Sequence, residues 1–253
     1  MGMHMKQRNG TNQNTSIQQG IRINKYLAEC GLCSRRDADQ MIAEGRVCVN
    51  GTPVLAGYRV TGQETITVNG KTIGGKTDKV VYAYYKPVGV ICTERDPHAK
   101  NKLTDHVKLP VRVTYAGRLD QDSEGLLILT NDGEMINELM RGANRHEKEY
   151  VVKVNREIDD DFLKKMSSGI YLRELEQTTR PCRVEAIGKF TFRIVLTQGL
   201  NRQIRRMCRE CHREVVSLKR VRINTLELGK LKPGEYRQLD AKECERLYAS
   251  VRR

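Results

Sequence analysis

Apolar and polar positions follow two successive patterns along the first part of the chain. In residues 21–45 apolar side chains recur at spacings of three and four, which predicts two short helices. Residues 47–51 and 65–73 alternate residue by residue and each contains an Asn-Gly pair, which is typical of short hairpin strands. Residues 1–20 are rich in Asn, Gln, Thr and Gly, so we expect a disordered tail there. The sequence therefore predicts a small helix–helix–strand domain over residues 21–78.

Longer apolar segments begin at about residue 79 and continue to the C-terminus. Their periodicity predicts strands at residues 80–85, 126–130, 144–154 and 185–197, and helices at residues 132–140, 159–166 and 241–251. A further helix is expected after Asn201, which is a favourable N-cap residue. The change of pattern favours a second domain over residues 79–253, joined to the first by the glycine-containing segment 74–78.

The charge balance of the chain is strongly basic. Among its 253 residues, 45 Lys and Arg face 31 Asp and Glu, a net charge of +14, which favours a polyanionic partner. An acidic protein partner, or a simple contribution to solubility, remains the alternative. The surplus concentrates between Gly199 and Arg222, where eight basic residues stand against two acidic ones. No apolar run approaches the roughly 20 residues of a membrane helix, and the N-terminus lacks a secretory signal pattern, so we expect a cytoplasmic protein without membrane contact.

Two arginines break a local rule of helix design. Ser34 and Asp37 form a capping-box pattern, which places Arg35 and Arg36 in the first turn of a helix, where the helix dipole disfavours cations. A bound anion such as an RNA phosphate would stabilise them there. The alternative is two solvated arginines whose repulsion is screened by salt.

The eight cysteines include two C-x-x-C pairs, Cys30/Cys33 and Cys208/Cys211. A zinc site would have to combine the two pairs across most of the chain, and Cys208 and Cys211 also fit an apolar helical face. We therefore expect reduced, buried thiols and no metal site, with zinc as the alternative.

The segment 115–125 carries the strongest candidate chemistry. Arg118 and Asp120 stand two residues apart between Gly117 and Gly125, and in an extended segment such residues point to the same side. A carboxylate facing a guanidinium stays ionised, which is a requirement for a carboxylate nucleophile. A structural ion pair in a turn is the alternative.

Three motifs resemble those of one enzyme family. Residues 117–133 read GRLDQDSEGLLILTNDG, residues 148–150 read KEY and residues 199–207 read GLNRQIRRM. They are similar to the active-site motifs of the RsuA/RluB/RluE/RluF family of ribosomal RNA pseudouridine synthases, and most similar to its large-subunit synthase F branch. Residues 21–27 and 45–51 resemble the S4 RNA-binding domain that such proteins carry. One departure is Tyr85, where the family usually has Asn.

The resemblance implies an α+β fold and a set of site residues. An S4-like RNA-binding domain of two helices and short strands would precede a catalytic domain on a mixed, mostly antiparallel sheet with flanking helices. Asp120 would be the nucleophile, Tyr150 would stack on the target base, Arg205 would pair with Asp120, and Ile204 would line the base pocket. Further RNA contacts are expected from Lys25, Arg35, Arg36, Lys86, Arg118, Arg202 and Arg206.

The implied reaction is the isomerisation of uridine to pseudouridine in 23S ribosomal RNA, and in tRNA as a further target. The nucleotide would be flipped into the site, and Asp120 would attack either C1′ of the ribose or C6 of the uracil. We expect a monomer that needs no cofactor, because the reaction involves no net redox change or group transfer. The alternatives are a non-catalytic RNA-binding or ribosome-assembly factor, and a glycoside hydrolase that pairs Asp120 with Glu124 or Glu149.

Overall fold

The computed structural model describes residues 20–94, 96, 98–141 and 145–251, which divide into two compact units. The first unit ends at Lys76 and the second begins at Thr77. Residues 1–19, where a disordered tail is expected, lie outside the described residues. Within the described part of the chain, every helix is too short or too polar to cross a lipid bilayer.

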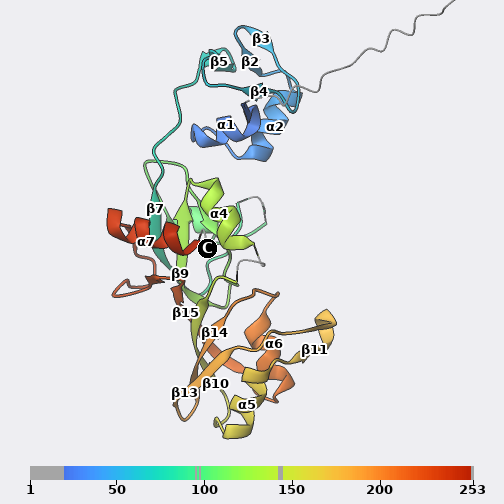
Figure 1. The fold of residues 1–253 in the computed structure, drawn as a ribbon, viewed down its shortest axis with the longest axis vertical. Helices are drawn as coiled ribbons and strands as arrows, with labels where there is room; N and C mark the ends of the chain where they lie inside the picture. The colour runs from blue at the N-terminus through green and yellow to red at the C-terminus, as the bar shows by residue number, and fades with distance from the viewer. Residues whose placement is uncertain (1–19, 95, 97, 142–144, 252–253) are drawn as a thin grey trace, which may run out of the picture. The chain divides into compact units, whose positions relative to one another are not determined.

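The first unit packs two helices on a small sheet (Figure 1). Its elements are β1 (Ile21–Arg22), α1 (Ile23–Glu29), α2 (Arg35–Ala43), β2 (Val47–Val49), β3 (Thr52–Pro53), β4 (Arg59–Val60), β5 (Ile66–Val68) and β6 (Lys71–Thr72). The capping box of α2 is confirmed, because Ser34 accepts from the Asp37 amide while the Asp37 carboxylate accepts from the Ser34 amide. Asn50 and Asn69 adopt positive φ angles before glycine, as two-residue hairpin turns require.

The second unit is built on a sheet of nine strands. Its elements are β7 (Val81–Lys86), α3 (Leu103–His106), β8 (Thr114–Ala116), β9 (Glu124–Thr130), α4 (Gly133–Met140), β10 (Lys148–Val154), α5 (Asp160–Ser168), β11 (Tyr171–Leu172), η2 (Arg173–Leu175), β12 (Gln177–Thr178), β13 (Arg183–Gly188), β14 (Thr191–Leu196), α6 (Gln203–Glu210), β15 (Val215–Ile223), β16 (Leu226–Glu227), β17 (Tyr236–Gln238) and α7 (Ala241–Val251). The main strand order is β13-β14-β10-β15-β9-β7-β17, and β15 with β9 is the parallel pair among otherwise antiparallel ones. The mixed, mostly antiparallel sheet that the resemblance implies is confirmed.

Three hydrophobic cores lie at different parts of this sheet, and two of them involve the helices α4 to α7. Figure 1 shows α4 and α7 beside β7 and β9, where Leu126 and Ile128 pack with Leu247. It also shows α5 and α6 beside β10 and β14, where Phe192 packs with Phe162. The central strands β10, β15 and β9 connect the parts of the sheet that these cores cover. Side chains at the ends of these strands therefore lie between well-packed regions.

Gly125 allows β9 and β15 to approach each other closely. Its φ angle is +110°, and a Cβ atom added there would lie 2.2 Å from the Arg220 carbonyl oxygen. No residue with a side chain fits at that distance without moving the backbone of β15. The close approach at Gly125 therefore determines where the loop that carries Asp120 joins the sheet.

The eight cysteines are free thiols. Cys33 packs in the core of the first unit, whereas Cys208 and Cys211 pack in the core around α6. Burial raises the pKa of Cys208 to about 12, so its thiol stays protonated and unreactive. The described residues contain no group of three or more His, Cys, Asp or Glu placed to hold a metal ion.

Candidate active site

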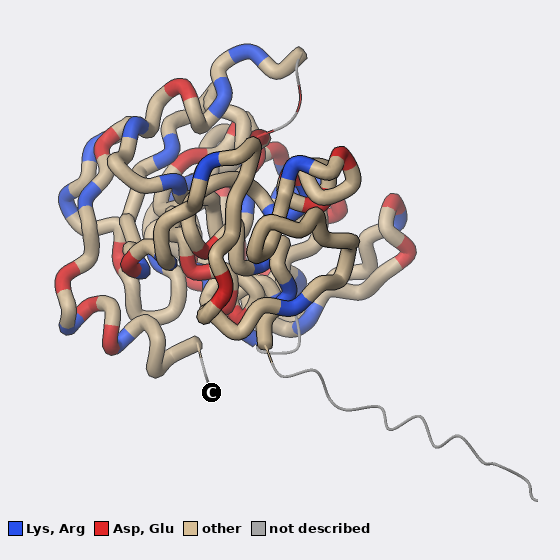
Figure 2. The backbone as a smooth tube through the Cα atoms, turned by 90° about the horizontal axis from the view of Figure 1, so that it is seen from above, with Lys and Arg blue, Asp and Glu red and all other residues tan. Residues whose placement is uncertain are grey.

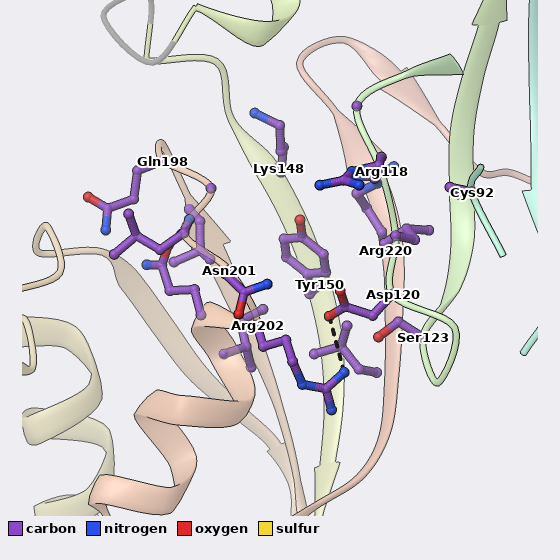
Figure 3. A pocket seen from close by; sticks show the side chains of 18 of the residues that line it. Cys92, Arg118, Asp120, Ser123, Lys148, Tyr150, Gln198, Asn201, Arg202 and Arg220 are labelled. Atoms are coloured by element: carbon purple, nitrogen blue, oxygen red, sulfur yellow. Dashed lines mark hydrogen bonds and ion pairs between the residues drawn. The ribbon is translucent and has the colours of Figure 1, made fainter. Parts of the chain in front are cut away.

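A cavity of about 570 Å³ lies where the ends of β9, β10 and β15 meet the beginning of α6 (Figure 3). Its volume is in the usual range for small-ligand sites. Its lining includes Arg118, Asp120, Lys148, Tyr150, Arg202, Ile204, Arg205 and Arg220. The structure thus brings together in one cavity the three residues predicted to be catalytic and three of those predicted to contact RNA or the base.

Lys86 stabilises the loop that carries Asp120 through hydrogen bonds to backbone carbonyls. Its side chain is completely buried, and its ammonium donates to the carbonyl oxygens of Ser123 at 2.7 Å and Pro87 at 2.9 Å. Burial lowers the pKa of Lys86, while the charge of Asp120 acts in the opposite direction. The prediction that Lys86 contacts RNA is therefore wrong, because a buried ammonium with two carbonyl partners cannot reach a ligand. It stabilises the loop instead.

The loop carries the carboxylates of Asp120 and Asp122, and two arginines contact Asp122 more closely than Asp120. Arg202 lies 3.7 Å from Asp120 but 2.6 Å from Asp122, and Arg205 contacts the Asp122 carboxylate at 3.3 Å and donates to the Asp122 carbonyl at 2.6 Å. Burial alone would raise the pKa of Asp122, but Arg202 and Arg205 outweigh it and hold that pKa below its usual value. The implied pairing of Arg205 with Asp120 is thus corrected. The ion pair at Asp120 comes from Arg202.

This division leaves Asp120 available for chemistry. Its side chain is 39% exposed, and Figure 3 shows it beside the Tyr150 ring with Arg202 on its other side. Asp122, by contrast, is occupied by both arginines. A carboxylate that faces a cavity next to a guanidinium, without being sequestered by it, has the arrangement that a nucleophile needs.

Tyr150 lies in the middle of β10, between Ile194 of β14 and Arg220 of β15. The side chain is partly buried, and its ring packs at the edge of the core around α6 while facing the cavity. Ile204 is buried next to it at the start of α6. The cavity wall at this point is an aromatic ring beside an aliphatic side chain, which is a surface for a flat base.

The beginning of α6 differs from the expectation. The helix starts at Gln203, and Arg202 occupies the N-cap in the left-handed conformation with φ +51°, so Asn201 is not the N-cap. Asn201 instead accepts two hydrogen bonds from Arg206, which also pairs with Glu174. The predicted RNA contact by Arg206 is not supported, because Asn201 and Glu174 already bind its guanidinium.

Three predicted RNA contacts belong to the first unit and not to this cavity. Arg35 and Arg36 are exposed in the first turn of α2. Lys25 lies on α1 and pairs with Glu29 at 3.6 Å. These three residues therefore lie in the first unit, where the S4-like RNA-binding domain is predicted.

Comparison with known proteins gives this geometry its context. Residues 80–210 match the family model of RNA pseudouridylate synthases, and residues 21–66 match the S4 domain. The chain is 42% identical over 232 residues to the dual-specificity RNA pseudouridine synthase RluF of Salmonella typhi, covering 91% of this chain and 79% of that protein. It is 38% identical to the ribosomal large subunit pseudouridine synthase B of Bacillus subtilis, covering 90% of this chain and 96% of that protein. A crystal structure of a pseudouridylate synthase superposes with a TM-score of 0.66 at 26% identity, over 90% of this chain and all of the other.

The chain belongs to the RNA pseudouridylate synthase family. Its resemblance to the RsuA/RluB/RluE/RluF group is confirmed, as is the N-terminal S4 domain. The catalytic interpretation is favoured over a non-catalytic RNA-binding or assembly factor, and the chain is an isomerase whose substrate is RNA. The glycoside hydrolase interpretation has no support in these matches.

Two lining residues of this synthase were missed in the sequence. Lys148 stands two positions before Tyr150 on β10, and strand alternation alone places it on the same face. Arg220 could not be found in this way. The register between β10 and β15 shifts between Glu149 and Tyr150, so that Arg220 lies opposite Tyr150 while Arg222 lies opposite Glu149. A strand irregularity of this kind changes the direction in which side chains point, and it has no clear signal in the sequence.

His146 links two elements at the cavity wall of the synthase. Its Nε2 lies 3.0 Å from the Glu138 carbonyl and its Nδ1 lies 3.0 Å from the Asn224 amide nitrogen. A carbonyl only accepts and an amide NH₂ only donates, so the ring is the neutral Nε2–H tautomer. Burial lowers the pKa of His146, in agreement with a ring that is neutral in the folded state.

We expect the free energy of unfolding to fall as the pH drops through about 6.5, because the unfolded state then binds a proton at His146 that the folded state resists. The contribution is fully present above this pH and is lost progressively below it. Urea unfolding between pH 5 and pH 8 measures the effect. His146→Gln should flatten the dependence, whereas replacement of the exposed His212 by Gln should retain it. An unchanged slope in His146→Gln would contradict this assignment.

Proposed function

We propose that the chain isomerises uridine to pseudouridine in 23S ribosomal RNA, with tRNA as a second substrate class. The names of its relatives support both parts, since one is a ribosomal large subunit synthase and another is described as dual-specificity. The observation that carries the proposal is the exposed Asp120 carboxylate beside Tyr150 in a cavity lined by arginines. Residues 21–78 bind RNA in this account, and residues 79–253 hold the reaction.

The reaction begins when the target nucleotide leaves its stack and enters the cavity, at a cost of roughly a few kcal/mol. Stacking on Tyr150 offsets this by ~1–3 kcal/mol. Asp120 then attacks C1′ or C6, and Arg202 stabilises its negative charge before the bond forms. The bond from N1 to C1′ breaks, a bond from C5 to C1′ forms, and the bond between Asp120 and the nucleotide breaks again, which regenerates the free carboxylate. C5 loses a proton and N1 gains one, so the atoms balance without a cofactor.

Lys86 and Arg205 act on the loop in this account. Lys86 binds the Ser123 carbonyl, and Arg205 binds the Asp122 carbonyl and carboxylate. Together they fix the backbone at the end of the turn that begins at Asp120, whose carbonyl accepts from the Ser123 amide at 3.1 Å. Holding a nucleophile to within a fraction of an ångström is a large part of catalysis. We propose that the enzyme works as a monomer in the cytoplasm, where its RNA substrates are made.

Pseudouridine mapping of ribosomal RNA and tRNA from a strain that lacks this gene tests the proposal. The expected result is the loss of at least one pseudouridine from 23S ribosomal RNA, restored by the gene on a plasmid. Identical maps in the deletion and parental strains would refute it. A loss confined to tRNA would keep the chemistry and change the substrate.

The exposed arginines Arg35 and Arg36 of α2 should contribute RNA affinity and take no part in the reaction. Replacing Arg35 and Arg36 together by Ala is expected to weaken RNA binding by roughly tenfold, and to reduce the slope of log K against log salt by about 1.5 units, because two phosphate contacts are lost. Filter binding over a series of salt concentrations measures both quantities. The control is Lys165→Ala, which removes an exposed cation of the second unit. An unchanged slope of log K against log salt in the double variant would exclude Arg35 and Arg36 from the RNA interface.

A further inference from the structure

Basic and acidic residues are interspersed over much of the chain (Figure 2). Most arginines of the second unit have an acidic partner. Arg222 and Arg193, for example, contact Glu149 at 2.8 and 3.1 Å. Lys148 and Arg220 are exceptions, because among the described residues neither makes an ion pair with a carboxylate. Both line the active-site cavity.

Strand geometry places these two cations on the cavity face and the acids on the other face. Along β10, Lys148 and Tyr150 face the cavity, whereas Glu149 turns away toward its arginine partners. The register shift in β15 brings Arg220 to the cavity face as well. Figure 3 shows Lys148, Tyr150 and Arg220 around the same space. The fold thus separates these cations from the nearest carboxylates of their own strand pair.

The polar atoms of both side chains are poorly satisfied. Arg220 is 2% exposed and donates from Nε to the Leu126 carbonyl at 2.7 Å, but its buried Nη2 has no partner. The Lys148 ammonium has one long contact, 3.4 Å from the His146 carbonyl. Burial, together with the smaller effect of the charge of Arg220, lowers the pKa of Lys148 to about 8. Two cations that repel each other at a partly desolvated cavity wall are unfavourable unless an anion binds there.

We propose that Lys148 and Arg220 bind a phosphodiester group of the RNA strand next to the flipped uridine. This inference rests on the proposed function. A uracil carbonyl would satisfy one donor but would leave two adjacent positive charges uncompensated. A phosphodiester supplies a full negative charge and two unesterified oxygens, which matches one ammonium and one free guanidinium nitrogen. The subsite holds the backbone of the extruded nucleotide while Tyr150 holds its base.

Neutral-linkage scanning tests the subsite directly. The probe is a stem–loop RNA that contains the mapped target uridine, with one phosphodiester at a time replaced by an uncharged methylphosphonate. In the wild-type protein, one linkage adjacent to the uridine should weaken binding by roughly tenfold when neutralised, as expected for loss of one charge-assisted contact. In Lys148→Met that same replacement should cost less than about twofold, because coupled partners are not additive.

Stability separates a ligand-binding role from a structural one. A residue that only supports the fold lowers the melting temperature when removed, whereas removing the unpaired cation in Lys148→Met should leave it unchanged or raise it. Lys164→Met, which removes an exposed lysine on α5, should alter neither stability nor the scan. Arg220→Lys, which retains the charge but loses the guanidinium, should weaken binding at the same linkage.

Two results would overturn the proposal. If each neutralised linkage reduced the RNA affinity of the wild-type protein and of Lys148→Met equally, the proposal would be overturned. Destabilisation of Lys148→Met with unchanged RNA affinity would overturn it in favour of a structural role. Either result leaves the proposed function intact if the wild-type protein isomerises the unmodified stem–loop, whereas failure of that reaction counts against the function itself.

Discussion

Replacing Asp120 by Asn is expected to lower the single-turnover rate of isomerisation by more than about a thousandfold, while RNA affinity stays within about twofold. The amide has almost the same shape as the carboxylate but cannot form the covalent bond to the nucleotide. Binding is retained because the phosphate and base contacts of the proposed mechanism come from other side chains that line the cavity. Rate and affinity are measured on the same transcript of ribosomal RNA.

The matched control for this prediction lies two residues away in the same loop. Asp122→Asn removes an equal charge but keeps the nucleophile, and it weakens the ion pairs that the Asp122 carboxylate makes with Arg202 at 2.6 Å and with Arg205 at 3.3 Å. We expect a smaller loss, roughly tenfold, because the loop is less well positioned. An inactive Asp122→Asn together with an active Asp120→Asn would reverse the assignment of the nucleophile.

Replacing Gly125 by Ala is expected to reduce the free energy of unfolding by roughly 3 kcal/mol or more. Alanine is strained at a φ of +110°, and its Cβ atom would lie 2.2 Å from the Arg220 carbonyl oxygen and 2.7 Å from the Arg220 nitrogen. Both atoms are backbone, so β9 and β15 would have to separate at their parallel pairing. Urea unfolding monitored by circular dichroism measures the change.

Gly133→Ala is the control for Gly125→Ala. Gly133 begins α4, and an added Cβ atom there meets nothing within 4 Å. Its replacement should change the free energy of unfolding by no more than about 0.5 kcal/mol, or raise it slightly. If Gly125→Ala were as stable as Gly133→Ala, the close approach of the two strands would not hold in solution, and the entry of the Asp120 loop would have to be reassigned.

Local sequence signals predicted much of the fold. The final helix spans Ala241–Val251 as its periodicity predicts, and the capping box at Ser34 and the Asn-Gly turns appear at their expected positions. These features depend on residues close in sequence, so the pattern contains the information. The cavity members Asp120, Tyr150 and Arg205 were also found, but through motif resemblance and not through periodicity, since they come from distant segments.

Features that depend on tertiary contacts were not predictable from the sequence. The burial of Lys86 follows from its place at the end of β7 beneath a loop 37 residues further on. The choice of Asp122 over Asp120 as the partner of Arg205 follows from how α6 docks on that loop. The orientation of Arg220 follows from a register shift between two strands. In each case the contacting residue is far away in the sequence, so local sequence patterns do not predict the contact.

The central claim is that the carboxylate of Asp120 carries out the isomerisation. The most direct measurement is carbodiimide-dependent primer extension on ribosomal RNA from the deletion strain, complemented with either the wild-type gene or Asp120→Ala at equal protein levels. The account predicts a stop at the target nucleotide with the wild-type gene and no stop with Asp120→Ala. A stop of equal strength with Asp120→Ala would contradict it.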